Sequence, residues 1–501
     1  MGCERNLPQN SCAWVARWCD EVVYHCPMVR GFAGESTLSD ADLGLALAPA
    51  LTPQGLVPVP SFFHGFATRP QVLARGLVTL ADVTATRYFR PVPTNLRDPV
   101  LTAQGDRLRA ECFSACNGVY ARLDLLGAGF DGGEITYGTT NVDIGLSTRQ
   151  ALSKVARDQL LHLDVGLEGM TVSSMDGTAK ERPVQMPDRW VRALGNAAEM
   201  HRGLGARVHL DAAAARQFVA SLPAVTSKSR SGWLTVTRTG AQVSPRPAKD
   251  AVHIEGLHRL SAAKRLLTDV KGVWVHGSAD GEPGPVLVTF ELPDARLVLG
   301  LTAEAWRGYS GEGSLLPALA DPNVVDDADM VSMVLAFEPV IDVPHLVAAT
   351  ALPEDRVRSA LAVLAASGRV GWDAHDEAYF HRELPDDATR VDKDNPRLVA
   401  ARKLAEAGAA RRGNEDGVWM VRSGDADYRV RLTADPAAAD LTRGATCTCT
   451  WYLRHGGDRG TCKHVLAVQL VSKSSGTVDL STSAFDEIVA DLGSLEEKSH
   501  E

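Results

Sequence analysis

Four residues of metal-binding type fall within eighteen residues near the C-terminal end of the sequence. Cys447 and Cys449 are separated by one residue, as are Cys462 and His464, and twelve residues lie between the two pairs. Three thiolates and one imidazole in so short a window form a typical ligand set for tetrahedral Zn²⁺. The spacing therefore predicts one bound zinc ion.

The residues around these ligands predict a small ββα unit. Residues 419–432 alternate between apolar and polar around a Gly-Asp bend, which is typical of a β-hairpin. We expect Cys447 and Cys449 on a further extended segment, where side chains two apart point to one side, and Cys462 at the start of a helix. Four protein ligands leave no open position, so the zinc is expected to be structural, with binding worth about 10–16 kcal/mol to folding.

This segment resembles the SWIM zinc finger, whose hallmark is C-x-C, a variable gap, and C-x-H. Cys447, Cys449, Cys462 and His464 match that pattern, and the Gly-Thr-Cys-Lys-His run at 460–464 is typical of it. The resemblance implies a role in DNA binding or in protein–protein contact. The chain as a whole looks like the bacterial SWIM-finger proteins, some of which are encoded beside MoxR-type AAA ATPases and von Willebrand factor A proteins. The resemblance therefore implies those proteins as partners.

Composition limits what the rest of the chain does. With 501 residues the chain is too long for one ordinary core, so several domains are expected. A formal net charge of -10 argues against a dedicated nucleic-acid-binding protein, so such a role would need a local basic patch. Nine cysteines are too few for a disulfide scaffold. Neither a long apolar run nor a signal pattern is present, so we expect a cytoplasmic protein without a membrane span.

We expect an α+β, multidomain chain with a winged-helix-like segment and a C-terminal ββα zinc module. The first residues differ from the rest and hold Cys3, Cys12, Cys19 and Cys26. A leader is favoured over the alternative of a second metal or redox site, because no C-x-x-C pair is present. The expected parts are a leader (1–50), an α+β domain (51–223), a β-rich domain (224–320), a winged-helix-like segment (325–390), the SWIM zinc finger (393–480) and an acidic tail (481–501).

The order helix, short turn, helix and hairpin within residues 325–390 is the layout of a winged helix. Asp342 is expected to cap its first helix. Arg356 and Arg358 would begin the recognition helix, but acidic residues surround them. We therefore favour a structural or protein-docking winged helix, with DNA groove binding as the alternative. The residues expected in its small core are Leu346, Val357, Leu361 and Leu364.

Other segments carry polar or reactive residues without a recognisable site. The glycine-rich residues 307–313 lack the G-x-x-x-x-G-K-[ST] arrangement of a phosphate-binding loop. Cys112 and Cys116 are expected to be buried free thiols rather than metal ligands. We expect residues 321–339, which are acidic at first, to form a linker, and residues 395–412 to form one helix that begins at an Asn-Pro pair.

Three functions remain open from the sequence. A non-enzymatic, zinc-binding adaptor that docks a protein partner is favoured, because the whole chain is acidic. The alternative is a nucleic-acid-binding protein, because residues 393–473 contain fourteen basic and nine acidic residues. An enzyme within residues 60–320 is least favoured, since Asp131, Glu134 and Asp143 have no recognisable catalytic spacing. The residues expected to contact a partner are Arg429, Arg431, Trp451 and Arg454.

Overall fold

The computed structural model describes most of the chain from residue 61 onward. Among the described residues, no helix has both the length and the apolar character needed to cross a membrane. The four cysteines of the first 50 residues and the acidic tail at 481–501 lie outside the described part. The described residues are 61–476, with gaps at 90–98, 226–229, 239, 336–338, 383, 385–388, 435–439 and 458, preceded by the short strands β1 (Thr37–Leu38), β2 (Leu43–Gly44), β3 (Ala50–Thr52) and β4 (Gly55–Val57).

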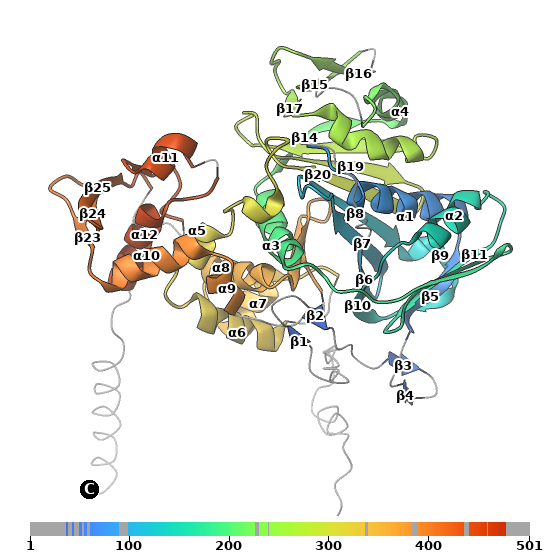
Figure 1. Cartoon of the computed structure of the whole chain (residues 1–501), viewed down its shortest axis with the longest axis horizontal. Coiled ribbons are helices and arrows are strands. Elements are labelled where there is room, and N and C mark those ends of the chain that lie inside the picture. Colours follow the sequence, from blue (N-terminus) through green and yellow to red (C-terminus); the bar gives the residue numbers. More distant parts are fainter. Residues whose placement is uncertain are drawn as a thin grey trace, which may run out of the picture.

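Eight antiparallel strands form the largest sheet (Figure 1). Its strands come from residues 100–141 and 205–301, and the two groups join where β8 pairs with β20. The sheet therefore crosses the boundary that the sequence placed between residues 223 and 224, because pairing between distant strands leaves no mark on the local pattern. In order across the sheet the strands are β10 (Tyr137–Asn141), β6 (Val100–Gln104), β7 (Arg107–Phe113), β8 (Val119–Leu126), β20 (Ala295–Leu301), β19 (Val286–Leu292), β18 (Gly272–Gly277) and β14 (Gly205–Leu210).

The central strands β7 and β8 alternate apolar and charged side chains, so that each kind occupies one face. Helix α1 (Pro70–Thr84) covers the apolar face: the Cys112 thiol lies 3.6 Å from the Leu80 carbonyl, and a Cβ on Gly76 would lie 2.7 Å from Leu123. The opposite face is charged and yet buried. Its buried charged residues are Arg107, Arg109, Glu111, Arg122 and Asp124.

Smaller sheets and helices complete the body of the protein. Helix α4 (Ala212–Ser221) is capped by Asp211, whose carboxylate accepts from the N–H groups of Ala213 and Ala214 at 2.9 Å. The five-stranded sheet comprises β13 (Gly177–Glu181), β12 (Gly169–Ser174), β11 (Leu161–Gly166), β5 (Ser61–Ala67) and β9 (Phe130–Ile135); the three-stranded sheet comprises β16 (Gly240–Ser244), β15 (Gly232–Thr237) and β17 (Val252–Ile254). The remaining helices of the body are η3 (Gly127–Gly129), α2 (Leu146–Lys154), α3 (Asp188–Arg202), η4 (Leu257–Leu266) and η5 (Tyr309–Gly311).

The winged-helix-like segment has the expected order of elements. Its two helices are α7 (Val343–Thr350) and α8 (Glu354–Ala366), and its hairpin is β21 (Val370–Asp373) with β22 (Ala378–His381). Asp342 caps α7 by accepting from the His345 N–H at 3.1 Å. The four expected core residues, Leu346, Val357, Leu361 and Leu364, are all buried.

The acidic stretch at residues 321–339 is not the linker that the sequence suggested. Residues Val324–Val334 form helix α6, which packs on α8. Asp327 is buried there and forms an ion pair with Arg356. The acidic residues therefore include one structural carboxylate, that of Asp327. Composition alone does not distinguish such a buried carboxylate from a solvent-exposed one.

The wing of the winged-helix-like segment covers the charged face of the large sheet. Asp373 of β21 lies 2.6 Å from Arg109 and 2.9 Å from Arg122, and all three side chains are at most 2% exposed. Arg382, just after β22, lies 2.6 Å from Glu111. The charged face of the large sheet is thus the surface on which the wing packs.

Residues 396–476, here called the C-terminal module, lie at one end of the molecule (Figure 1, orange to red). The expected single helix over 395–412 ends at Glu406, and a strand follows. The module has four strands and three helices, more than the expected ββα unit. They are β23 (Ala410–Arg412), β24 (Val418–Ser423), β25 (Ala426–Arg431), β26 (Thr446–Cys447), α10 (Pro396–Glu406), α11 (Thr450–His455) and α12 (Lys463–Gly476); the short helices α5 (Leu316–Leu319) and α9 (Thr389–Lys393) precede them.

Helix α12 takes part in two cores. Val465 and Val468 pack with the strands of the C-terminal module, in the cluster that also holds Trp419. Leu466 and Leu470 pack in the core of the winged-helix-like segment. Helix α12 therefore belongs both to the core of the C-terminal module and to the core of the winged-helix-like segment.

Candidate metal centre

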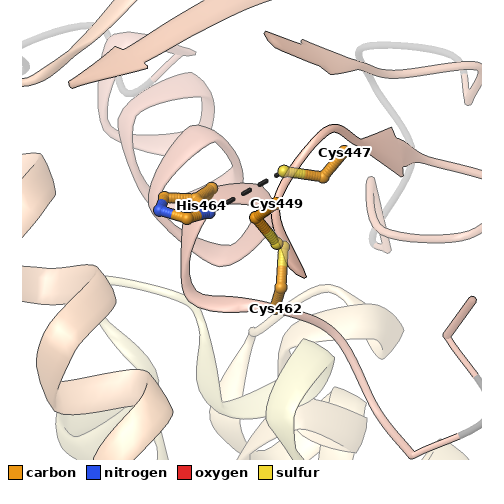
Figure 2. Close-up of side chains that lie close together, drawn as sticks. All are labelled: Cys447, Cys449, Cys462 and His464. Atoms are coloured by element: carbon orange, nitrogen blue, oxygen red, sulfur yellow. Dashed lines mark hydrogen bonds between the residues drawn. The ribbon is translucent and has the colours of Figure 1, made fainter. Parts of the chain in front are cut away.

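The four predicted ligands converge at the start of α12 (Figure 2). Their donor atoms all lie within 4.8 Å of one another. Cys447 Sγ lies 3.7 Å from His464 Nδ1. All four side chains are buried. The described part of the chain contains no other group of three or more Cys, His, Asp or Glu residues with this convergence.

This arrangement fits zinc. With Zn–S bonds of about 2.3 Å and a Zn–N bond of about 2.0–2.1 Å, neighbouring donors in a tetrahedron lie about 3.5–3.8 Å apart. The separation of 3.7 Å between Cys447 Sγ and His464 Nδ1 agrees with that value. Cys447, Cys449, Cys462 and His464 are thus positioned to bind one zinc ion, and four buried protein ligands leave no coordination position for a substrate.

Three local structures hold the four ligands. Cys447 ends strand β26, which pairs with β25 so that Cys447 faces Val430. The sequence analysis placed Cys449 on the same extended segment as Cys447, and this is wrong. Cys449 instead caps α11, and its sulfur accepts from the Tyr452 N–H at 3.4 Å. Cys462 and His464 lie at the start of α12, as expected. Two of the three sulfurs therefore sit at helix N-termini, where the helix dipole favours a thiolate.

Hydrogen bonding and burial shift the pKa values of the three thiols. The hydrogen bond from Cys447, with help from His464 and the N–H group of Val465, lowers the pKa of Cys462 to about 4. The same hydrogen bond raises the pKa of Cys447, and burial raises the pKa of Cys449. The pKa of Cys462 is thus lowered and those of Cys447 and Cys449 are raised, so metal binding to the three thiolates releases protons.

Arg397 of α10 holds the loop that carries Cys462. Its Nη1 donates to the carbonyl oxygens of Arg459, Gly460 and Thr461 at 2.9, 3.1 and 3.2 Å. Its guanidinium also lies 4.4 Å from the centre of the Trp451 ring, a cation–π geometry. Nothing in the sequence distinguishes this arginine from a solvated one, because its partners are backbone atoms more than 60 residues away.

The glycine-rich loop at 307–313 meets the same part of the C-terminal module. A Cβ on Gly460 would lie 2.6 Å from the Gly313 Cα, and Gly460 has a φ of 76°. Both conditions favour glycine. The glycines at this point therefore permit two backbones to approach closely, and the loop serves as a contact between the body and the C-terminal module.

The His464 imidazole is further fixed by stacking. The Tyr428 ring lies 4.2 Å from it at an angle of 21°. Nε2 of His464 is buried and has no hydrogen-bond partner among the described residues, whereas Nδ1 faces the sulfurs. The stacking thus presents Nδ1 to the metal position.

Comparison with known families agrees with this geometry. Residues 428–471 match the family model of the SWIM zinc finger. The match covers the SWIM segment alone and not the body of the chain. The four ligands, strand β26 and helix α11 lie within it, as do the first turns of α12.

Beyond the SWIM segment the comparisons assign nothing. No curated protein matches the chain. Among solved structures, proliferating cellular nuclear antigen from Entamoeba histolytica is 12% identical over 48% of this chain and 99% of its own, with a TM-score of 0.33. The PCNA2–PCNA3 complex from Sulfolobus tokodaii is 10% identical over 48% of this chain and 98% of its own, with a TM-score of 0.34. These scores are too low to support an argument about fold or function.

The residues expected to contact a partner fall into two groups. Arg429 and Arg431 are exposed on β25, where both donate to Glu415 at 2.8 Å. Arg454 is exposed in the last turn of α11. Trp451 is half-buried, and its indole N–H donates to the Gly460 carbonyl at 3.2 Å. Trp451 thus stabilises the ligand loop, which leaves the arginines as the exposed members of the set.

The arginines of β25 belong to a wider surface, here called the outer face. It is the solvent side of β23, β24 and β25, opposite the side that packs on α12. The cross-strand register places Arg411 beside Met420 and Met420 beside Arg429. The outer face consists of Arg411, Met420, Arg422, Asp427, Arg429 and Arg431.

Other polar groups singled out in the sequence do not gather into a site. Asp131 and Glu134 are exposed on β9 of the five-stranded sheet, whereas Asp143 follows β10 of the large sheet. Cys112 is buried, as expected, and Cys116 is only partly buried. The Cys116 sulfur lies 3.4 Å from the Ser114 hydroxyl. None of these residues lies in the metal-binding group.

Proposed function

We propose that the chain is a non-enzymatic docking protein, in which a structural zinc ion holds the C-terminal module and the outer face binds an acidic segment of a protein partner. The observation that carries the proposal is the separation between the buried metal ligands and the exposed arginines. The outer face carries four arginines (Arg411, Arg422, Arg429 and Arg431), and the ion pairs that three of them form among the described residues involve two carboxylates, Glu415 and Asp427. An excess of positive charge on a rigid sheet favours a negatively charged ligand.

Two shallow hollows beside the outer face supply apolar contact. One, of about 480 Å³, is lined by Arg429, Arg431, Tyr452 and Leu453 among others, and Leu453 is 73% exposed. The other, of about 450 Å³, is lined by Arg411, Met420 and Arg422 among others. Charged groups beside apolar hollows are typical of surfaces that bind a protein segment through a few apolar anchors.

The partner class follows from resemblance as well as from charge. Bacterial proteins with a C-terminal SWIM finger, which this chain resembles, include some encoded beside MoxR-type AAA ATPases and von Willebrand factor A proteins. Those two classes are therefore the first partners to test. The proposal places the interaction in the cytoplasm, where zinc-binding thiols stay reduced.

Nucleic-acid binding is the second candidate, supported by the same four arginines. The winged-helix-like segment gives it little support. Arg356 of the expected recognition helix is paired with Asp327, and Arg358 with Glu354. The wing is buried against the large sheet through Asp373. Groove binding through that segment would require these contacts to break, so any nucleic-acid role rests on the outer face alone.

Two binding measurements test the proposal. The double variant Arg429→Glu/Arg431→Glu should lose affinity for a purified MoxR-type AAA ATPase or von Willebrand factor A protein. Arg246→Glu/Lys249→Glu, an equal change of charge at an exposed loop of the body, should not. Filter binding to mixed single- and double-stranded DNA over a salt series separates the alternative. Affinity for DNA with a clear salt slope, lost in the double variant, would favour the nucleic-acid function instead.

A further inference from the structure

We infer that the outer face also binds a segment of this same chain, residues 477–501, and that this segment competes with the partner. The claim that the segment competes with a partner rests on the proposed docking function of the outer face. Binding of the segment itself is a separate claim. It is argued from the charge of the two surfaces, from the hollows beside the outer face and from the length of chain after α12.

The charges are complementary. Residues 477–501 contain seven acidic residues and one lysine. The arginines of the outer face that face solvent are substantially exposed: the Arg422 side chain is 63% exposed and the Arg431 side chain 52%. Glu415 accepts from two arginines at once, so a further carboxylate can approach either of them. The acidic residues of the segment are Asp479, Asp486, Glu487, Asp491, Glu496, Glu497 and Glu501.

The apolar residues of the segment match the hollows. Phe485, Ile488, Val489 and Leu492 recur at intervals of three and four, a spacing typical of one apolar face with acidic residues between its members. The exposed counterparts on the C-terminal module are Met420, 38% exposed, and Leu453. One hollow lies beside each of these two residues. The outer face thus offers both apolar anchors and basic neighbours to such a sequence.

The chain is long enough to reach. Helix α12 has 14 residues and so spans about 21 Å, and it packs on the inner side of the sheet. A return along α12 and around the sheet edge requires about 30 Å, when about 10 Å is allowed for the thickness of the packed layers. From Gly476 to Phe485 there are nine residues, which extend to about 30 Å. The apolar residues from Phe485 onward can therefore lie over the outer face of their own module.

A photocross-linking experiment on the full chain tests this inference. Phe485 is replaced by benzoylphenylalanine, which reacts with nearby C–H bonds, and the linked peptides are identified by mass spectrometry. We expect linkage within one chain to the region of Met420 or Leu453. Reversing two weak surface contacts with Arg429→Glu/Arg431→Glu should lower the yield about five- to tenfold. Arg246→Glu/Lys249→Glu, the control of equal charge change, should leave it unchanged, and both variants should keep one zinc per chain.

Three outcomes would overturn the inference: linkage mapped away from the outer face, linkage of unchanged yield in the double variant, or linkage between two chains, which would make a second copy the occupant. The result is independent of the proposed function. If the partner binds the outer face but no linkage forms, only this inference fails. If linkage forms within the chain and no partner binds even when residues 477–501 are removed, the docking function fails and the intramolecular contact stands.

Discussion

Replacing Asp373 with asparagine tests whether the wing is held to the large sheet by buried charge. Asp373 lies 2.6 Å from Arg109, 2.9 Å from Arg122 and 3.7 Å from Arg107, and its side chain is 2% exposed. Removing one member of a buried ion pair typically costs about 3–5 kcal/mol, because the remaining charge stays buried. Asp124 and Asp376 still lie near these arginines, so we expect the lower end, about 3 kcal/mol.

Hydrogen exchange of the wing measures this effect without assuming that a chain of several parts unfolds in one step. A loss of about 3 kcal/mol raises the exchange rates of the β21–β22 amides about 100-fold. Asp427→Asn is the matched control, since its partner Arg422 is 63% exposed and the pair is expected to contribute at most about 1 kcal/mol. An increase of less than about tenfold in the wing for Asp373→Asn would refute the argument that these charges hold the interface.

The same interface should weaken in acid. Burial alone would raise the pKa of Asp373, but the Arg122 and Arg109 guanidiniums outweigh it and hold that pKa well below its usual range. A lowered pKa in the folded state contributes stability above the unfolded value of about 3.9, and that stability is lost as the pH falls further. Protection of the wing in the unaltered chain should therefore fall below about pH 4, whereas Asp373→Asn, lacking this carboxylate, should lack that component.

Further predictions concern the metal centre. Cys462→Ser should reduce zinc to well below one per chain and unfold β24, β25 and α11, while β7 and β8 keep their exchange protection; unfolding of the whole chain would contradict this. Zinc affinity should rise with pH, with about two protons released per zinc at neutral pH. The reason is that the pKa values of Cys447 and Cys449 are raised and that of Cys462 is lowered. Calorimetry in buffers of different ionisation enthalpy counts the released protons. Gly460→Ala should destabilise the ligand loop by about 1–3 kcal/mol, because its Cβ would meet Gly313. Gly424→Ala is the control, since Gly424 also has a positive φ but has open space around it, and it should cost only about 1 kcal/mol. Equal effects of the two variants on hydrogen exchange would rule out the backbone contact.

The sequence allowed the metal centre to be predicted because its ligands lie close together in the chain. Cys447, Cys462 and His464 also occupy the local structures that were expected. Cys449 does not, because the local sequence does not distinguish a cysteine that caps a helix from one at the end of a strand. The hairpin at 418–431 and the helices of the winged-helix-like segment followed from apolar spacing and from one cap, that of Asp342.

The contacts between parts of the chain could not be predicted. The register between β8 and β20 joins residues more than 150 positions apart, and local patterns carry no information on such pairing. The charged side chains of β7 and β8 alternate with apolar ones as they would on a sheet with one solvent-exposed face. Their burial beneath the wing therefore cannot be predicted without knowing where Asp373 lies. Arg397 likewise resembles a solvated helix residue, although it binds three carbonyl groups of the ligand loop.

The double membership of α12 makes zinc binding and the packing of the body thermodynamically linked. Zinc fixes the first turn of the helix, and the next turns place Leu466 and Leu470 in the core of the winged-helix-like segment. A metal that binds the folded helix more tightly than the unfolded one stabilises every contact that this helix makes. By reciprocity, a ligand that tightens the body against α12 also increases the affinity for zinc. The metal content of this chain is therefore a readout of events far from its four ligands.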